Sequence, residues 1–266
     1  MSVFLENCLE SLDYDPKFAS VFKGWYMKYR QNIVVFTGAG VSAESGISTF
    51  RDKDGLWTNY DAMKLASIDG FRDDPEAVLD FYNDRRWQLF DAKPNHAHYA
   101  LAELEKLHDV TIITQNVDDL HERAGSTKVV HLHGELTKVT SSRDREDDRC
   151  IKYYPLNLPI YLGHKAEDGS QLRPYIVWFG EYLRYMDEAR TLVENADIFV
   201  VIGTSLVVYP AAGLVGYAHH EIPKFLVDPS DMEGHLPYGY KHIKAKATEG
   251  IDIVIEEISK IKMNNG

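Results

Sequence analysis

The chain has 266 residues, of which 44% are hydrophobic and 26% charged, and its formal net charge is −12. This length accommodates one large domain or one domain with insertions, and the acidic balance argues against nucleic acid as a partner, because phosphate contacts need clustered Lys and Arg. No apolar run approaches the roughly 20 residues of a membrane helix, so we expect no membrane partner. The two cysteines, Cys8 and Cys150, lie far apart, which favours a reducing, cytoplasmic environment and excludes a zinc site made of four cysteines.

Short apolar segments alternate with helical stretches along the chain. The first thirty residues have apolar side chains at helical spacing and predict a helix. Five β-branched, apolar runs predict buried strands, at residues 33–36, 110–114, 129–132, 198–202 and 224–227. Residues 251–255 predict a sixth strand, followed by a terminal helix. This alternation is typical of an α/β fold, and we expect a Rossmann-like, doubly wound parallel sheet with helices on both faces.

Two regions interrupt the alternation. Residues 58–95 predict helices rich in aromatic side chains, and residues 137–176 are polar and then rich in Tyr and Pro, without a clear period. We expect both to be insertions that form a smaller domain, with residues 1–57, 96–136 and 177–266 forming the larger, discontinuous one. The second insertion is expected to have a small apolar core, made of Tyr153, Tyr154, Leu156, Leu158, Ile160 and Tyr161.

A glycine-rich turn follows the first predicted strand directly. Residues 38–43 have the pattern GxGxxA, a form of the dinucleotide fingerprint, in which glycine lets a pyrophosphate approach the backbone. A tight turn without a ligand is the structural alternative. The candidate NAD-binding residues of this turn are Gly38, Ala39, Gly40, Ser42 and Ala43. A hydride-transferring dehydrogenase would have a strand and an acidic residue next; residues 45–57 instead predict a polar loop, which disfavours that class and is typical of a functional segment.

Five segments, in order, resemble the sirtuin family of NAD-dependent protein deacylases. They are GAGVSAESGISTFRDKDGLW at 38–57, TQNVDDLH at 114–121, HLHGEL at 131–136, RPYIVWFGE at 173–181 and GTSLVVYPA at 203–211. The resemblance spans roughly residues 30–255 and implies a Rossmann-like fold with NAD as the cofactor. It also implies acyl-lysine proteins or peptides as substrates, and release of nicotinamide, deacylated lysine and O-acyl-ADP-ribose.

The resemblance also implies the catalytic residues. A histidine can accept a proton near neutral pH, and His131 and His133 would share a face if the strand continued. Spacing leaves both histidines open, whereas the family pattern places the base directly before Gly-Glu and selects His133. Asn116 and Asp118 are the other implied catalytic residues, since an amide and a carboxylate suit a carboxamide and ribose hydroxyls. Turn chemistry is the structural alternative for both.

Further contacts to NAD and to the substrate peptide follow from the same resemblance. Phe50 would shield the reactive ribose carbon and Arg51 would help hold the cofactor, with a solvated charge as the alternative for Arg51. Asp228, where the family usually has Asn, could accept from two ribose hydroxyls and would favour NAD over NADP. The other implied NAD contacts are Thr49, Trp57, Gln115, Gly203, Thr204, Ser205 and Ala247. A peptide would add as a strand through Val177, Phe179, Gly180 and Glu181.

Tyr82 and Arg85 carry a hypothesis about the acyl group. On a helix, positions i and i+3 share a face, and a Tyr hydroxyl beside an Arg guanidinium can clamp a carboxylate. The spacing resembles the sirtuin subclass that removes succinyl, malonyl and glutaryl groups, and Ala66 matches its small pocket-lining residue. The alternative is an amphipathic helix with Tyr82 packed and Arg85 solvated.

The chain departs from the sirtuin pattern in the segment that usually contains two CxxC pairs in that family. Asp147, Asp148, Cys150 and His164 are conceivable ligands there, but their spacing does not support a tetrahedral site, and we predict no zinc. An NAD glycohydrolase or ADP-ribosyltransferase on the same fold is the main alternative function, and a non-catalytic NAD or acyl-lysine reader is a further one. The substrate segment at 177–181 favours deacylation. The retained catalytic side chains disfavour the reader.

Overall fold

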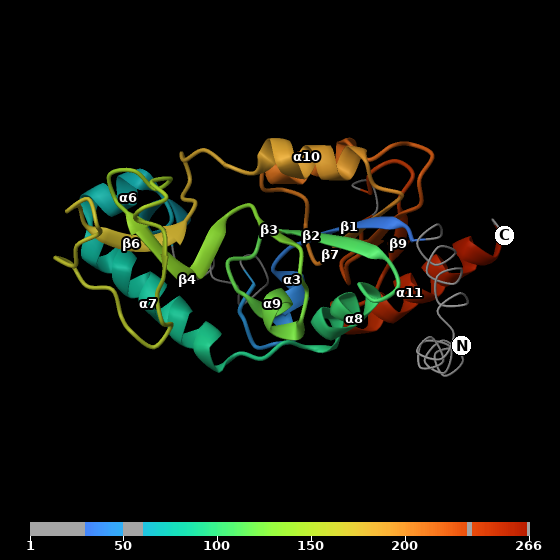
Figure 1. Cartoon of the computed structure of the whole chain (residues 1–266), viewed down its shortest axis with the longest axis horizontal. Coiled ribbons are helices and arrows are strands. Elements are labelled where there is room, and N and C mark those ends of the chain that lie inside the picture. The colour runs from blue at the N-terminus through green and yellow to red at the C-terminus, as the bar shows by residue number, and fades with distance from the viewer. Residues whose placement is uncertain (1–29, 50–60, 233–235, 265–266) are drawn as a thin grey trace, which may run out of the picture.

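The larger sheet is parallel and six-stranded. The computed structural model describes residues 30–49, 61–232 and 236–264 (Figure 1). Its larger sheet has the strand order β3-β2-β1-β7-β8-β9, and neighbouring strands are parallel throughout. The strands are β1 (Asn32–Thr37), β2 (Asp109–Thr114), β3 (Val129–His131), β7 (Ile198–Ile202), β8 (Lys224–Val227) and β9 (Lys241–Ile243). The five apolar runs predicted as strands are therefore confirmed, whereas the helix predicted for the first thirty residues lies outside the described residues.

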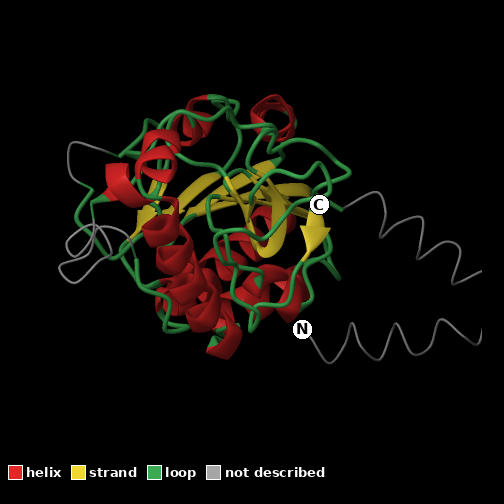
Figure 2. Ribbon diagram, turned by 90° about the vertical axis from the view of Figure 1, so that its left-hand side faces the viewer, coloured by secondary structure: helices red, strands yellow, loops and turns green. Residues whose placement is uncertain are grey.

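Helices cover both faces of this sheet, as Figure 2 shows. They are α3 (Gly40–Ala43), α8 (His96–Leu104), α9 (Leu120–Ala124), α10 (Met186–Glu194), the 3-10 helix η2 (Ala211–Gly216) and α11 (Ala247–Asn264). Alternate residues of β1 are buried in two separate apolar cores, one on each face of the sheet. Ile33 and Val35 pack with α8 and α11, and Val34 and Phe36 pack with α10 and η2. The strands are apolar on both faces because both faces are covered, and the doubly wound Rossmann-like fold is confirmed.

The strand predicted at residues 251–255 is wrong. These residues belong to α11, and the sixth strand of the sheet is β9. Ile251, Val254 and Ile258 are buried while Ile253 is exposed, which is the three-and-four spacing of one helix face. β9 escaped prediction because it is a three-residue edge strand in which Ile243 alone is buried.

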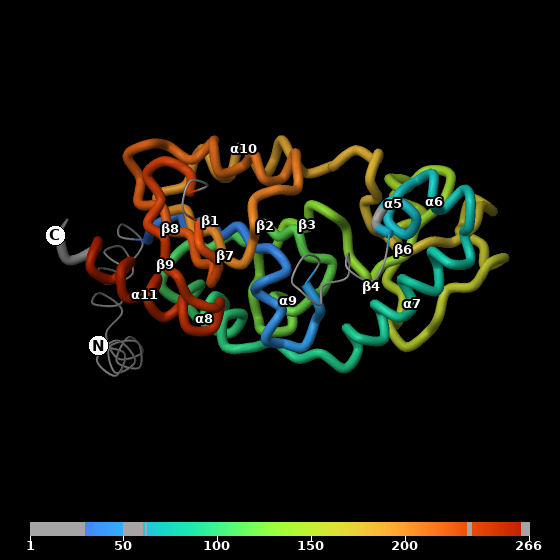
Figure 3. Tube along the Cα trace, turned by 180° about the vertical axis from the view of Figure 1, so that it is seen from behind, coloured from blue at the N-terminus to red at the C-terminus, as the bar shows by residue number. Residues whose placement is uncertain are grey.

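A smaller antiparallel sheet lies at one end of the molecule (Figures 1 and 3). Its order is β5-β4-β6, with β4 (Gly134–Ser141), β5 (Lys152–Tyr153) and β6 (Leu172–Ile176). The inserted helices α5 (Ala62–Leu65), α6 (Ile68–Asp73) and α7 (Pro75–Asp91) lie at the same end. The division into domains at residues 57/58, 95/96, 136/137 and 176/177 remains our proposal.

The apolar core predicted for residues 137–176 is partly wrong. Leu156 and Ile160 are buried. Tyr153, Leu158 and Tyr161 are 71%, 46% and 56% exposed. The difference arises because Ile160 packs with residues outside the predicted set, Leu79 of α7 and Val139 of β4, and Tyr154 lies at the edge of that cluster.

Buried polar side chains of α7 hold this segment in place. The Arg86 side chain is fully buried, and its guanidinium donates to main-chain carbonyls of Leu136, Tyr154, Pro155 and Leu158. Burial lowers the pKa of Arg86 to about 10. Asn83 donates to the Ile160 carbonyl at 3.0 Å and accepts from the Ile160 amide at 2.8 Å. These hydrogen bonds satisfy main-chain groups of a loop that has little regular secondary structure of its own.

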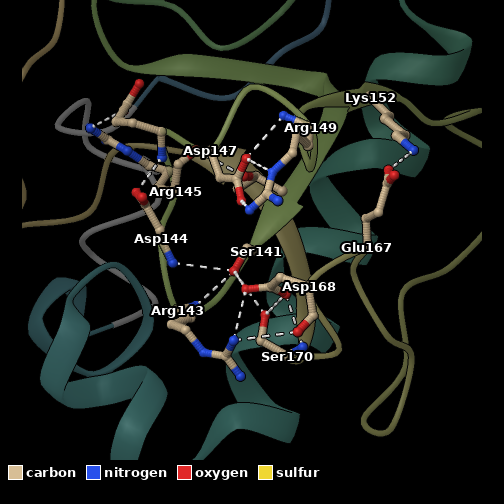
Figure 4. A network of polar contacts seen from close by, with 12 residues as sticks. Ser141, Arg143, Asp144, Arg145, Asp147, Arg149, Lys152, Glu167, Asp168 and Ser170 are labelled. Carbon is tan, nitrogen blue, oxygen red and sulfur yellow. Dashed lines mark hydrogen bonds and ion pairs between the residues drawn. The ribbon is translucent and has the colours of Figure 1, made fainter.

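A second polar network lies at the end of β4, around Ser141 (Figure 4). Ser141 Oγ donates to Asp168 Oδ2 at 2.8 Å, and Ser170 donates to Asp168 Oδ1 through its amide and its hydroxyl, at 2.9 and 2.7 Å. These hydrogen bonds lower the pKa of Asp168 to about 2. Asp147 pairs with the neighbouring Arg149 at 2.7 Å.

Candidate active site

The candidate NAD site lies where strands β1, β2 and β7 end. Gly38 follows β1, Gln115 follows β2 and Gly203 follows β7. From β1 the chain adds strands on one side (β2, β3) and then on the other (β7, β8, β9), so the switch point of the sheet lies between β1 and β7. Doubly wound sheets bind ligands at the carboxyl ends of the strands beside such a switch point. The fold thus brings together the three segments that the sequence singled out separately.

The glycines of the β1 turn are packed against the β7 turn. A Cβ on Gly38 would lie 2.7 Å from the Gly203 carbonyl oxygen, and one on Gly40 would lie 2.7 Å from the Gly203 Cα. The Gly40 amide donates to that same carbonyl at 2.9 Å. Gly203 has φ +64, a conformation that favours glycine. The two glycines of the GxGxxA pattern are therefore required by turn-to-turn packing, whether or not a ligand is bound.

Ser42 is the centre of a buried hydrogen-bond network. Its hydroxyl donates to Asp118 Oδ2 at 3.0 Å and accepts from Asn116 Nδ2 at 3.1 Å. Burial raises the pKa of Asp118, while hydrogen bonds from the Leu120 amide and Ser42 oppose the shift. Asn116 and Asp118 are thus held by Ser42 of α3, and Asp118 Oδ1 also accepts from the Leu120 amide at 3.2 Å.

Two histidines without a predicted role support this network. His98 Nδ1 accepts from the Asn95 amide at 3.2 Å, so Nε2 carries the proton and faces Ser42 Oγ at 3.4 Å. The rings of His98 and His121 lie 4.8 Å apart, and His121 Nε2 is 3.2 Å from Thr37 Oγ1. Burial lowers the pKa of His98 to about 4 and holds the pKa of His121 well below its usual range. The Asn95-to-His98 capping spacing was visible in the sequence; the contact with Ser42 was not.

The two candidate bases have different surroundings. His131 is buried with both ring nitrogens occupied: Nδ1 lies 3.2 Å from the Asn116 carbonyl and Nε2 lies 2.7 Å from Glu122 Oε1. Burial disfavours charge on His131, but the hydrogen bond and charge of Glu122 outweigh it and raise its pKa. The two histidines do not share a strand face, because β3 ends at His131. His131 is therefore committed to holding α9 and the β2 turn.

His133 has one ring nitrogen engaged at 2.8 Å with the Gln115 carbonyl oxygen. Because a carbonyl can only accept, Nδ1 donates, and Nε2 is the nitrogen with a lone pair. Burial lowers the pKa of His133, so the ring is neutral at pH 7. Gln115 in turn donates through its side chain to Thr204 Oγ1 at 2.9 Å, which connects the β2 turn to the β7 turn.

Arg85 lines the same pocket as Ser42, Asn116 and Asp118. The pocket is lined by Ala39, Ser42, Ile47, Ser48, Arg85, Leu89, Asn116, Val117, Asp118 and Leu136. Arg85 is buried, so the alternative of a solvated guanidinium on an amphipathic helix is wrong. Tyr82, one turn earlier on α7, is also buried, and burial raises its pKa well above the ordinary range. Ala66 is buried, and its carbonyl accepts from the Phe179 amide at 2.8 Å.

The predicted substrate segment follows β6 as an irregular stretch. The Val177 amide donates to the His133 carbonyl at 2.9 Å, and Phe179, which is partly exposed, forms an isolated parallel bridge with Ser67. Gly180 has φ +93. Glu181 points into the fold: its carboxylate lies 2.7 Å from Arg173 Nη1 and accepts from the Trp178 amide at 2.8 Å.

The remaining predicted contacts are more dispersed. Thr204 is buried and Ser205 exposed after β7, and Asp228 follows β8 with Oδ1 accepting from the Ser230 amide at 2.8 Å. Ala247 is buried at the start of α11. Ala43 ends α3 and Thr49 lies in the loop beyond it. Phe50, Arg51 and Trp57 lie outside the described residues.

Neither a metal cluster nor a membrane helix occurs in the described part of the chain. Within residues 30–49, 61–232 and 236–264, no three His, Cys, Asp or Glu side chains are grouped so that they could hold an ion. In the same ranges, no helix has the length and apolar character to cross a bilayer.

Comparisons with known proteins agree with this geometry. Residues 38–210 match the model of the Sir2 family. A Bacteroides thetaiotaomicron protein named NAD-dependent protein deacylase is 53% identical over 84% of this chain and 95% of its own length. A Sir2 homologue solved with ADP-ribose has a TM-score of 0.75 at 41% identity, over 86% of this chain and 92% of that one. A Sir2 homologue–NAD complex has a TM-score of 0.73 at 41% identity, with 86% and 90% covered. The chain belongs to the Sir2 family.

Proposed function

We propose that this protein is an NAD-dependent protein-lysine deacylase that favours acidic acyl groups, namely succinyl, malonyl and glutaryl. The observation that carries the proposal is the convergence of His133, the Asn116–Asp118 pair and Arg85 on one region of the fold. The name of the Bacteroides relative supports the general activity. The acidic preference rests on the two side chains of α7.

The polar groups at the strand ends suit NAD. Asn116 and Asp118 are buried, lie in the pocket and offer amide and carboxylate groups to a carboxamide and to ribose hydroxyls. The glycine turn after β1 would let a pyrophosphate approach the backbone, and Asp228, which follows β8, would hold the adenosine ribose. When bound, NAD supplies an electrophilic ribose carbon and nicotinamide as the leaving group.

We assign His133 as the general base. Its Nδ1–H is held by the Gln115 carbonyl, which leaves Nε2 to accept a proton from a ribose hydroxyl. His133→Ala should lower kcat for deacylation by about 10²- to 10⁴-fold while leaving NAD binding within a few-fold. His131→Ala, the matched control, should instead lower thermal stability. Full deacylation by His133→Ala would disprove the assignment.

The acyl preference is assigned to Arg85 and Tyr82. A guanidinium lining the pocket and a phenol one helical turn away can both donate to a terminal carboxylate, and charged hydrogen bonds of this kind are the stronger ones. Ala66 leaves space beside them for a longer acyl chain. An acetyl group has no carboxylate and would gain nothing from either donor.

Matched acetyl-, malonyl- and succinyl-lysine peptides test the proposal with NAD, with nicotinamide and deacylated peptide followed together. Arg85→Met should reduce the succinyl-to-acetyl ratio of kcat/KM by about 10- to 100-fold, the range expected for a charged hydrogen bond. Arg149→Met, at an exposed arginine between β4 and β5, is the control and should leave the ratio unchanged. An unchanged ratio in Arg85→Met would overturn the acidic preference, and nicotinamide release without peptide would favour the NAD glycohydrolase.

We further propose that residues 137–176 fold without zinc and that the protein acts in the cytoplasm. The hydrogen bonds of Arg86, Asn83 and Asp168 support the first statement, because they hold polar groups of the segment in place without a metal ion. The buried free thiol of Cys150 is in keeping with the second. Stoichiometric zinc in the purified protein would contradict the first.

A further inference from the structure

The loop that joins β4 to β5 contains three arginines, of which Arg145 alone is buried (Figure 4). Its side chain is 7% exposed, whereas those of Arg143 and Arg149 are 68% and 77% exposed. A guanidinium that is removed from water needs polar partners, because burying an unpaired charge costs free energy. The partners of Arg145 therefore show what this side chain holds in place.

These partners include the end of the proposed peptide segment, residues 177–181. Arg145 Nη2 donates to the Tyr182 carbonyl at 2.5 Å. Nη1 lies 3.5 Å from Glu181 Oε2, a contact between charges without hydrogen-bond geometry. Arg145 also forms an ion pair with Glu146, its neighbour in the chain, at 2.5 Å. The loop between β4 and β5 therefore contacts the last residue of the peptide segment and the residue that follows it.

The main chain of the peptide segment depends on Glu181 for its shape. Residues 177–181 lie between β6 and α10, outside any helix or strand. The Glu181 carboxylate accepts from the Trp178 amide at 2.8 Å, and the Glu181 amide donates to the Trp178 carbonyl at 3.0 Å, so these two residues close a turn. Arg173 of β6 approaches the same carboxylate at 2.7 Å. Glu181 is thus held by one arginine from the sheet and by Arg145 from the loop.

We propose that Arg145 is a positioning residue for the substrate peptide. By holding the Glu181 carboxylate and the Tyr182 carbonyl, it keeps the main chain of residues 177–181 in the geometry that an added strand requires. Arg145 does not line the pocket that contains Arg85, Asn116 and Asp118, so its effect should be confined to the peptide main chain. This inference rests on the proposed deacylase activity and its peptide segment, and it gives the loop between β4 and β5 a part in substrate binding.

Two substrates with the same acyl group separate this role from a general loss of structure. One is a peptide with several residues on each side of a central acyl-lysine. The other is the same acyl-lysine blocked at both ends, which is too short to add as a strand. The acyl group is acetyl or succinyl, whichever the wild type removes faster. Arg145→Met should lower kcat/KM for the peptide by about 10-fold, mainly through KM, and for the blocked acyl-lysine by less than about 2-fold, since a charged hydrogen bond to the peptide segment is lost.

Arg143→Met is the matched control, because Arg143 lies on the same loop with an exposed side chain, and it should leave both values unchanged. If Arg145→Met does not fold, Arg145→Lys keeps the charge but lacks the planar fork, and should still lower the peptide value by about 3-fold. Equal losses for the two substrates would overturn this inference alone. So would an unchanged peptide value in Arg145→Met or, where that variant does not fold, in Arg145→Lys. A wild type that deacylates neither substrate would overturn the proposed function and this inference together.

Discussion

The larger and the smaller sheet are stabilised by different kinds of interaction. The larger sheet buries continuous apolar strands between helices, and residues such as Val34, Phe36 and Ile113 have no exposed surface. The smaller sheet packs in two apolar clusters, one that includes Leu136 and Ile176 and a smaller one around Ile160. It also depends on buried arginines, of which Arg86 binds carbonyls and Arg173 binds a carboxylate. Apolar burial tolerates small changes in geometry, whereas a buried guanidinium requires its acceptors in place. The comparison predicts which substitutions each sheet withstands.

Loss of Arg86 should have the largest effect on stability. Arg86→Met leaves several buried carbonyls without a donor, and removing one partner of a buried polar network costs about 3–5 kcal/mol. The free energy of unfolding from urea titration would measure it. Arg149→Met is the matched control, since Arg149 is exposed and its ion pair is with nearby Asp147. Equal stability of Arg86→Met and wild type would contradict a polar-held smaller sheet.

Acid should weaken the larger sheet first. The pKa of His98 is about 4 in the folded protein against 6.5 for the free side chain. The unfolded chain therefore binds the proton first, and the contribution of His98 to stability is lost as pH decreases from about 6.5 towards 4, by about 3 kcal/mol at about 1.4 kcal/mol per pKa unit. Asp168 in the smaller sheet has a folded pKa of about 2, so its contribution is present above 3.8 and is lost only below that value.

Urea unfolding at pH 7, 5.5 and 4.5 measures this difference. His98→Gln keeps a side chain that can donate to Ser42 but cannot titrate, so its stability should depend less on pH than that of the wild type. The same pH dependence in both proteins would show that His98 does not titrate upon unfolding.

A single methylene should matter more in the larger sheet. Ile113→Val removes it from a fully buried position among many apolar neighbours, and we expect a loss of about 1 kcal/mol. Ile160→Val removes it from the small cluster with Leu79 and Val139, and we expect about 0.5 kcal/mol. Urea midpoints would compare them. The reverse order would mean that the smaller sheet depends on apolar packing after all.

The smallest effect is expected at Arg143. Its side chain is 68% exposed and lies 3.6 Å from Asp168, which Ser141 and Ser170 already bind. An exposed pair of this kind adds little, so Arg143→Ala should not move the urea midpoint measurably. A clear shift would show that the network of Figure 4 depends on its exposed cation.

The same difference explains what the sequence could predict. The strands of the larger sheet were predictable because burial on both faces produces continuous apolar runs, and the strand ends located the Gly38, Gln115 and Gly203 segments. β4 and β6 were not predictable, because the register shifts between Glu135 and Val139 and because buried Arg173 has the sequence character of a surface residue.

Pairs distant in sequence limited prediction at the site. Spacing could not choose between His131 and His133, since the partner that occupies His131 is Glu122 on α9. The family pattern made that choice, and the hydrogen bonds now give a physical reason. His98 was not predicted at the site because its contact with Ser42 joins residues 56 positions apart.

The chain crossings between the sheets have a mechanical consequence. Leu132 and His133 alone separate β3 from β4, and the return crossing starts at Val177, directly after β6. The Val177 amide donates to the His133 carbonyl at 2.9 Å, so the two crossings are pinned to each other. A rotation of the smaller sheet against the larger one would turn about this pin. His133, the proposed base, and Val177, at the start of the proposed peptide segment, would then keep their mutual distance while the width of the site changes.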